Sequence, residues 1–328
     1  MSAAGQGALL MTYGSPASLD REDVRGYLAR VRGGREPAPE LVDEFTRRYR
    51  LIGGSPLVVI TRAQAEALAV RLGWPVEVGM RFSEPSILSG LHRLAERGVQ
   101  DVAGIVLSPQ YSPLLMGGYT RAIEEAREEM GDRAPRVEVA PAWHDEPAFV
   151  GALARRVREA LAWIPADERE ALTVLMTAHS LPRRVAEQEP GYLAQLRETA
   201  EVVATLAGLP ESRWHFCWQS AGHEPGEWMK PDLAELMPEL AASGTRAILI
   251  VPIQFLADHL EVLFDVDVAA REQAERSGLR FYRTQSLNVD PGIIGSLASV
   301  ARRVLRSADE RTGQPGPVGA GYASRRGA

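Results

Sequence analysis

Short apolar runs alternate with longer amphipathic segments along most of the chain. Short runs rich in β-branched residues predict strands, and apolar residues at helical spacing predict helices. Strands are predicted at 8–12, 76–79, 102–107, 137–139, 173–177, 215–217, 247–251 and 279–282. Helices are predicted at 21–31, 40–50, 62–71, 86–97, 119–129, 147–161, 192–206, 232–242, 260–276 and 293–305. Because strand and helix largely take turns, the pattern predicts an α/β protein with parallel sheets and helices on both faces.

A weak internal repeat divides this pattern into two halves. Residues 10–16 read LMTYGSP and residues 175–182 read LMTAHSLP, and a second pair follows as VLSPQY at 106–111 and IVPIQF at 250–255. Both pairs occur in the same order and lie at the ends of predicted strands. We therefore expect two similar doubly wound, Rossmann-like domains. Ligands of such sheets bind beyond the carboxyl ends of the strands, so the four loops are expected to face one cleft between the domains.

The expected boundaries follow from this division. The N-terminal domain is predicted to cover residues 1–145 and to be joined by a C-terminal helix at 293–306. The C-terminal domain is predicted to cover residues 146–292. Residues 309–328 are rich in Gly, Pro and charge, which predicts a disordered tail.

Composition excludes several classes of function. The formal net charge of −6 argues against non-specific binding of nucleic acid, which needs a basic surface. The single cysteine, Cys217, excludes an internal disulfide and a four-thiolate iron–sulfur cluster and fits a reducing cytoplasm. Neither a signal peptide nor an apolar run of about 18 residues is present in the sequence. We expect a cytoplasmic protein without an integral membrane segment.

His179 is the first candidate for chemistry. It lies at the end of a predicted strand, in a loop that Pro182 restrains. Neutral imidazole can accept a proton or bind a divalent metal near pH 7. The alternative is a loop histidine that is hydrogen-bonded to its own backbone, and the residues alone leave both interpretations open.

The segment FLADHLE at 255–261 also follows a strand. Asp258 and Glu261 have the spacing of a helix N-terminal capping pair, and the local pattern favours that interpretation. In the alternative, Glu261 points into the cleft, pairs with His179 and raises its basicity. Asp265 shares a helix face with Glu261. Such carboxylates suit proton conduction or a hydrated cation, and they also suit a solvated helix face.

Two further segments offer ligand contacts. When the two halves are compared, Tyr13 falls beside the position that His179 takes in the second half. There it could cover an aromatic ligand or pack at a domain edge. Arginines at 30, 32, 35, 47, 48 and 50, followed by GGSP at 53–56, could bind carboxylates or phosphates. A solvated helix end accounts equally well for several of these arginines.

Together these segments resemble the ferrochelatase family from about residue 8 to residue 305. The resemblance is carried by LLMTYGSP, YLARVRGGREP, GGSPL, VGMRFSEPSI, LSPQYS, TAHSLP, CWQSAGHEP and VPIQFLADHLEVLFDVD. It implies two chelatase-type domains and insertion of ferrous iron into a porphyrin. The chain is most similar to the soluble bacterial branch, which in Gram-positive and related bacteria makes coproheme from coproporphyrin III.

The resemblance also implies roles for single residues. His179 would be the catalytic histidine on one porphyrin face, accepting pyrrole protons or receiving the metal, with Glu261 as its acidic partner. Tyr13 would stand on the opposite face as a possible axial ligand.

Other implied roles lie at the rim. Propionate contacts would come from Arg32, Ser55 and Tyr119. Arg48 and Asp265 resemble an outer site for a hydrated cation, although the family's further glutamate one turn on is Ala269 here.

The implied reaction defines the expected partners. Fe²⁺ and porphyrin are substrates, and neither an organic cofactor nor an iron–sulfur cluster is expected. We expect a monomer that hands its product transiently to the next enzyme of heme synthesis. Coproporphyrin carries four propionates and protoporphyrin two, so the arginines favour coproporphyrin. Three alternatives remain: a protoporphyrin IX ferrochelatase that makes protoheme, a cobalt chelatase, and a non-catalytic porphyrin or heme carrier.

Overall fold

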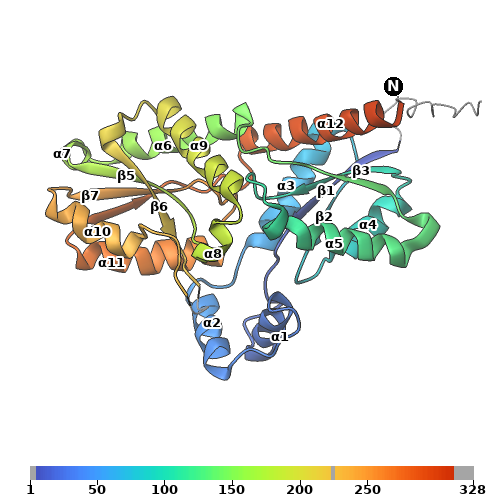
Figure 1. Cartoon of the computed structure of the whole chain (residues 1–328), viewed down its shortest axis with the longest axis horizontal. Helices are drawn as coiled ribbons and strands as arrows, with labels where there is room; N and C mark the ends of the chain where they lie inside the picture. Colours follow the sequence, from blue (N-terminus) through green and yellow to red (C-terminus); the bar gives the residue numbers. More distant parts are fainter. Residues whose placement is uncertain (1–4, 223–225, 314–328) are drawn as a thin grey trace, which may run out of the picture.

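Two four-stranded parallel sheets lie side by side in the computed structural model, which describes residues 5–222 and 226–313 (Figure 1). The first sheet has the order β2-β1-β3-β4 and the second has the order β6-β5-β7-β8. The strands are β1 (Gln6–Thr12), β2 (Val76–Met80), β3 (Asp101–Val106), β4 (Arg136–Val139), β5 (Leu172–His179), β6 (Trp214–Gln219), β7 (Ala247–Pro252) and β8 (Arg280–Arg283). The predicted fold class and all eight predicted strands are confirmed.

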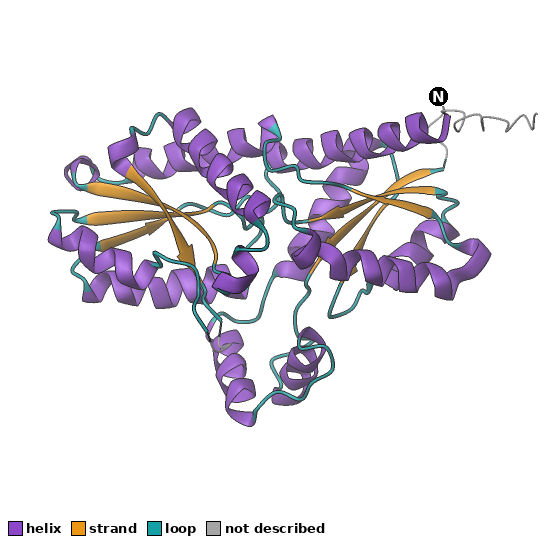
Figure 2. Cartoon of the chain, viewed as in Figure 1, coloured by secondary structure: helices purple, strands orange, loops and turns teal. Residues whose placement is uncertain are grey.

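Helices cover both faces of each sheet (Figure 2). The α-helices are α1 (Arg21–Val31), α2 (Pro39–Leu51), α3 (Leu57–Leu72), α4 (Ile87–Glu96), α5 (Pro113–Met130), α6 (Pro147–Trp163), α7 (Ala166–Glu170), α8 (Arg183–Ala186), α9 (Pro190–Ala207), α10 (Leu233–Ala242), α11 (Arg271–Arg276) and α12 (Pro291–Gly313). Two short 3₁₀ turns are η1 (Gly131–Arg133) and η2 (Glu211–Arg213). Each predicted helix has a counterpart, whereas the short α7 and α8 were not predicted.

The predicted helix 260–276 is divided in the structure. Its first part is a π-helix, η3 (Glu261–Ala270), and α11 follows it. A π-helix closes hydrogen bonds from i to i+5 and is rare outside functional sites. Glu261 is the first residue of this element, directly after the loop that follows β7.

Each sheet reverses its strand order beside its first strand. In the first sheet β1 lies between β2 and β3, with Met11 opposite Gly79 and Val106. In the second sheet β5 lies between β6 and β7, with Thr177 opposite Cys217 and Pro252. The carboxyl ends of β1, β3, β5 and β7 therefore flank the two crevices where ligands of doubly wound sheets bind.

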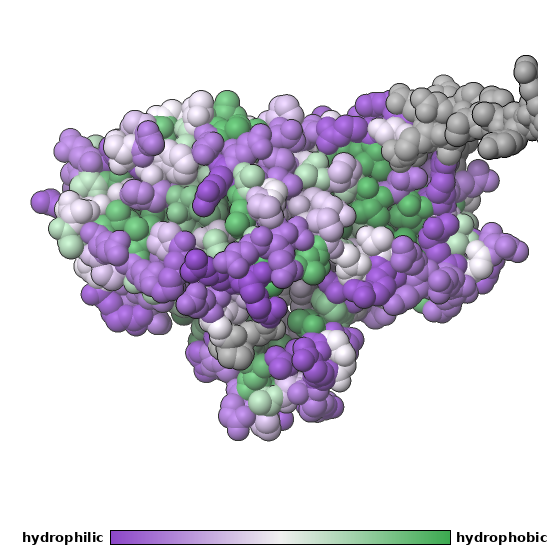
Figure 3. Space-filling view, viewed as in Figure 1, coloured by the Kyte–Doolittle hydropathy of each residue, from purple (hydrophilic) through white to green (hydrophobic). Residues whose placement is uncertain are grey.

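Helices α1 and α2 form a lobe that projects from the junction of the two sheets (Figure 1). This lobe is inserted between β1 and α3, so it belongs to the first half only. A small apolar core fixes it against η3, where Leu28 and Tyr49 of the lobe cluster with Leu260 and Phe264. Polar residues cover most of the face in Figure 3, with smaller apolar areas between them, one of them on the lobe.

Helix α12 connects the two halves. It packs on α3, β3 and β4 of the first half and also on α6. It continues to Gly313, so the prediction of disorder is wrong for residues 309–313. The helix continues because ADERT lacks a helix breaker, and the Gly and Pro residues begin only at 313. Residues 314–328 lie outside the described residues. The division at 145 and 146 and the joining of helix 293–306 to the first domain stay predictions.

Asp290 ties the start of α12 to α6. Its buried carboxylate accepts hydrogen bonds from Arg155 Nη2 at 2.5 and 2.6 Å and from the backbone N–H of Gly292 at 2.7 Å. Arg156 Nη2 lies 3.2 Å from its second oxygen. Burial raises the pKa of Asp290, but the bonds from Arg155 and Gly292 and the two positive charges outweigh burial, so the net pKa lies below its ordinary value.

We predict that Asp290→Asn lowers the free energy of unfolding at pH 7 by about 1 to 3 kcal/mol, because charge-assisted hydrogen bonds are lost. The folded-state pKa is lowered, so this stabilisation is fully present above the unfolded pKa of about 4 and disappears as pH falls through the folded pKa. Urea unfolding at pH 7 and at pH 3 measures both effects. Equal midpoints of the variant and the wild type at pH 7 would contradict the prediction.

Candidate active site

A cavity of about 440 Å³ lies between the two sheets. The loops after β1, β3, β5 and β7 all line it, through Tyr13, Ser108, Leu181 and Gln254. Residues of α1, α2, α3, α5, α9 and η3 also line it. The expectation that four strand-end loops face one cleft is therefore confirmed.

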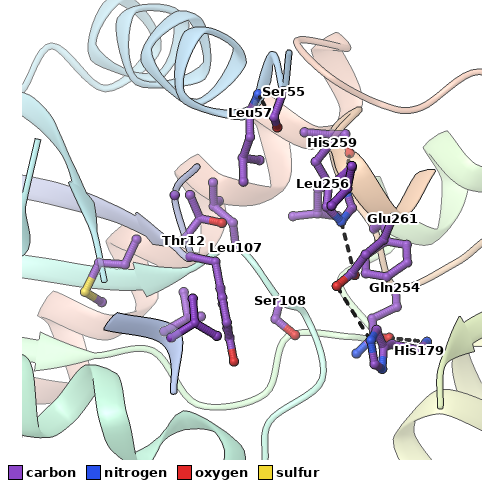
Figure 4. Close-up of a pocket in the computed structure, with 18 of the residues that line it drawn as sticks. Thr12, Ser55, Leu57, Leu107, Ser108, His179, Gln254, Leu256, His259 and Glu261 are labelled. Atoms are coloured by element: carbon purple, nitrogen blue, oxygen red, sulfur yellow. Dashed lines mark hydrogen bonds and ion pairs between the residues drawn. The ribbon is translucent and has the colours of Figure 1, made fainter. Parts of the chain in front are cut away.

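Most of the wall is apolar, and its polar groups are few and grouped. A large apolar pocket with a few convergent polar groups is the typical site for a hydrophobic small molecule. Among the apolar lining residues are Leu28, Val31, Phe45, Leu57, Leu107, Leu115, Met116 and Leu256. In Figure 4, Thr12 and Leu107 lie across the cavity from His179 and Glu261.

His179 is the last residue of β5, and its ring borders the cavity. The backbone N–H of His179 donates to Gln254 Oε1 at 2.8 Å. Its ring Nδ1 lies 2.5 Å from the carbonyl oxygen of Ser180, which can only accept, so Nδ1 carries the proton. In the neutral ring Nε2 is then the acceptor. The hydrogen bond to the local backbone that the second interpretation expects is present, and the same ring borders the cavity; its role in proton transfer or metal binding stays a prediction.

Glu261 lies between two histidines (Figure 4). One oxygen, Oε1, is 3.6 Å from Nε2 of His179, and the other, Oε2, is 3.3 Å from Nε2 of His259. His259 Nδ1 donates to the carbonyl oxygen of Ala257 at 2.9 Å, so its Nε2 donates to Glu261 when the ring carries a second proton. The three side chains form one hydrogen-bonded and ion-paired group on the cavity wall.

The capping interpretation of Asp258 and Glu261 is wrong. No side chain caps η3, and Asp258 bonds instead to Ser286 and Asn288 in the loop after β8. The spacing favoured a cap because the capping signature depends only on two residues three positions apart and takes no account of partners elsewhere in the chain. The partners that outweigh this local pattern are distant in the sequence: Ser286 and Asn288 for Asp258, and His179 for Glu261.

The two histidines keep Glu261 anionic. Burial raises the pKa of Glu261. The charge of His179 and the hydrogen bond from His259 together lower it by more than burial raises it, so the net pKa falls to about 2. Burial lowers the pKa of His259, and the contact with Glu261 more than reverses this, so its net pKa is raised. The wall therefore holds a negative charge between two imidazoles.

Aromatic rings form another part of the wall. Tyr13 is 47% exposed, and its ring makes edge contacts with Phe82 and Tyr119 at centroid distances of 5.0 and 6.5 Å. Tyr119 is buried, and the guanidinium of Arg81 lies 5.5 Å from the centre of its ring. Burial raises the pKa of Tyr13, Arg81 lowers it and Glu261 raises it. Tyr13 is thus a neutral phenol that faces the cavity.

The predicted rim residues differ in their placement. Ser55 and Tyr119 line the cavity. Arg32 is exposed at the end of α1 and is not among the lining residues, although Val31 before it is. The structure therefore brings the first two into the site and places Arg32 beyond its edge.

Arg48 and Asp265 meet outside the cavity lining. Arg48 Nη1 lies 3.5 Å from Asp265 Oδ1, and its Nε donates to Glu44 at 2.8 Å. The Arg48 guanidinium also lies 4.9 Å from the centre of the Phe264 ring. Burial raises the pKa of Asp265. Within residues 5–222 and 226–313, no three His, Cys, Asp or Glu residues form a group that could hold a metal. The outer cation site stays a prediction.

His259 is the site residue that sequence reasoning missed. It precedes Glu261 by two residues in the segment ADHLE, and the loop between β7 and η3 turns both side chains toward the same place. A histidine so close to a candidate carboxylate after a strand end was the available signal.

The comparisons with known proteins agree with this geometry. A model of the Ferrochelatase family matches residues 5–305. A ferrochelatase of Deinococcus radiodurans is 41% identical over 303 residues, which cover 90% of this chain and 95% of that protein. The coproporphyrin III ferrochelatase of Geobacillus kaustophilus is 36% identical and covers 90% of this chain and 94% of its own length. The one of Bacillus subtilis is 35% identical and covers 93% and 99%.

A solved structure shows the same fold. SirB from Bacillus subtilis with Fe³⁺ superposes with a TM-score of 0.56 at 13% identity, over 93% of this chain and 98% of that chain. No helix within the part of the chain that the structure describes has the length and apolar character needed to cross a membrane. The family match over residues 5–305 and the identity to ferrochelatases over about 90% of the chain show that this protein belongs to the ferrochelatase family, the enzymes that insert metal into porphyrin.

Proposed function

We propose that the protein inserts ferrous iron into coproporphyrin III and releases coproheme. The observation that carries the proposal is the group of Glu261, His179 and His259 on the wall of an apolar cavity. Relatives at 33–36% identity bear the name coproporphyrin III ferrochelatase, which supports the choice of substrate. The relative at 41% identity is named ferrochelatase without a stated porphyrin, which keeps protoporphyrin IX as the second candidate.

The reaction requires a base beside the ring. A porphyrin holds two N–H protons in the hole that Fe²⁺ enters, and both must leave. Nε2 of His179 accepts a proton, because its Nδ1 already donates to Ser180. The anionic Glu261 stabilises the resulting imidazolium. Both side chains are partly exposed, so the imidazolium releases its proton to solvent and Nε2 then accepts the second pyrrole proton in the same way. Tyr13 stands at the other face of the ring as an oxygen donor to the iron.

The rim supplies contacts to the substituents. Ser55 and Tyr119 offer hydroxyl donors to propionates from the cavity wall. Arg32 follows Val31 on α1, so a propionate that extends past the cavity edge meets its guanidinium. An arginine fork binds a carboxylate with two hydrogen bonds. Four propionates use these groups more fully than two.

The remaining parts of the proposal concern partners and place. The imidazoles and the carboxylate suffice for proton removal, so the proposed reaction uses Fe²⁺ as substrate and needs no organic cofactor or iron–sulfur cluster. We propose a cytoplasmic monomer that passes coproheme on to the next enzyme of heme synthesis.

The first prediction separates an enzyme from a carrier. His179→Ala removes the proton acceptor and leaves the apolar wall, so we expect kcat for insertion to fall at least 100-fold, on the order of the effect of a general base. The dissociation constant for porphyrin should change by less than about threefold. Anaerobic insertion assays and fluorescence titration measure the two quantities. Turnover near the wild-type value in the variant would remove His179 from the mechanism.

The second prediction concerns the porphyrin. With Fe²⁺ under anaerobic conditions, coproporphyrin III should be turned over at a kcat/KM at least tenfold above that for protoporphyrin IX, because each charge-assisted propionate contact contributes about 1.5 to 3 kcal/mol. Parallel assays at equal detergent concentration measure the ratio. A higher value for protoporphyrin would show that protoheme is the product.

A further inference from the structure

The loop that carries His259 and Glu261 is fastened by a residue of another loop. The backbone N–H of Asn288 donates to the carbonyl oxygen of Leu256 at 2.8 Å. The backbone N–H of Asp258 donates to Asn288 Oδ1 at 2.9 Å, and Asn288 Nδ2 donates to Asp258 Oδ2 at 2.9 Å. Asn288 therefore bonds to the loop at both ends of residues 256–258, one residue before His259.

Asn288 is itself held from the first half of the chain. Its carbonyl oxygen accepts a hydrogen bond from Nε2 of Gln64 on α3 at 2.6 Å. Gln64 is fully buried, and within the described residues its Oε1 has no hydrogen-bond partner. Leu57, at the start of the same helix, lines the cavity. A continuous set of hydrogen bonds thus joins α3 to the loop before η3.

The other oxygen of Asp258 is also occupied. Ser286 Oγ donates to Asp258 Oδ1 at 2.7 Å, and Arg283 lies 3.6 Å from the same oxygen. Arg283 in turn forms a bidentate pair with Asp267 of η3 at 2.7 and 2.8 Å. The loop before η3 and η3 itself are therefore held against the end of β8 and the loop after it.

The backbone of Asn288 explains the choice of residue. Its φ is +46°, in the left-handed region that asparagine and glycine tolerate better than other residues. A side-chain amide also accepts from the Asp258 N–H through its oxygen and donates to the Asp258 carboxylate through its nitrogen at the same time. Both requirements point to asparagine at this position.

We propose that Asn288 is a positioning residue for metal insertion, which sets His259 and Glu261 against His179 and couples their place to α3. The proposal rests on the part of the proposed function in which Glu261 and the histidines handle the pyrrole protons. The contacts of Glu261 are 3.6 and 3.3 Å long, so a shift of the loop by about 1 Å breaks them, and such a shift can lower a rate about 100-fold.

The first test is Asn288→Gly. Glycine adopts φ of +46° without strain, so the variant loses both side-chain hydrogen bonds while the backbone stays unstrained. We expect kcat for iron insertion to fall about 10- to 100-fold, with a porphyrin dissociation constant within about twofold of wild type. The porphyrin used is the one that the wild type turns over faster, so the result does not depend on which porphyrin that is.

Asp290→Asn is the matched control. It weakens the same corner of the molecule two residues further on, and its bonds go to α6 and Gly292, not to the loop before η3. This variant should lose stability and keep kcat within about twofold of wild type. If Asn288→Gly keeps the wild-type kcat, or if Asp290→Asn loses as much kcat at equal loss of stability, the positioning role is overturned.

A reciprocal exchange provides the second test. Asn288→Asp places two carboxylates against each other, so this variant should lose kcat at least tenfold. Asp258→Asn removes the charge beside Arg283 and still offers an amide oxygen to Asn288 Nδ2, so its loss should be smaller. The double variant restores a donor opposite an acceptor and keeps one negative charge near Arg283. The kcat of the double variant should be at least tenfold higher than the value expected from multiplying the kcat losses of the two single variants. Additive losses would overturn the proposal.

The two variants His179→Ala and Asn288→Gly distinguish a failure of the proton mechanism from a failure of the positioning role. If His179→Ala keeps its turnover, the proton mechanism fails whatever Asn288 does. If His179→Ala loses turnover while Asn288→Gly does not, the mechanism stands and the positioning role of Asn288 fails.

Discussion

A carboxylate on the wall of an apolar cavity is the constraint around which this site is built. Partial burial disfavours the charge of Glu261, and ionised groups in such places need a partner of opposite charge or several hydrogen-bond donors. Here two imidazoles face the carboxylate, one from the end of β5 and one from the loop after β7. Each supplies a positive charge and an N–H donor when it is protonated at Nε2. The rest of the fold supports this arrangement, because each imidazole is oriented by a backbone carbonyl at its other nitrogen.

The sheets explain why the two imidazoles meet. Strands β5 and β7 are neighbours, and their carboxyl ends reach the same edge. The strands β1 and β7 are almost wholly apolar and buried, so the polar groups of the site lie at a strand's last residue, as His179 does in β5, or in the residues that follow. Position at a strand end therefore concentrates the chemistry of both halves in one cavity.

Much of this organisation could be read from the sequence. The alternation of apolar runs gave the strands within one or two residues at most ends, and the echo of LMTYGSP in LMTAHSLP located Tyr13 and His179 at equivalent strand ends. Partners distant in the sequence could not be read in this way. The bonds between Asp258 and Asn288 span 30 residues and depend on the left-handed backbone of Asn288. Without knowledge of this distant partner, the local pattern made the Asp258 carboxylate look like a helix cap. The π-helical start at Glu261 and the exposed place of Arg32 likewise follow from tertiary packing.

The two halves share a design, but only the first carries the lobe of α1 and α2. That lobe contributes Tyr27, Leu28, Val31, Phe45 and Tyr49 to the cavity without adding a strand to either sheet. A change confined to α1 and α2 can therefore alter the shape of the cavity without changing the strand end that carries His179 or the loop that carries His259. The residues of the lobe that determine which molecule fits the cavity are thus separate in the chain from the residues proposed to react with that molecule.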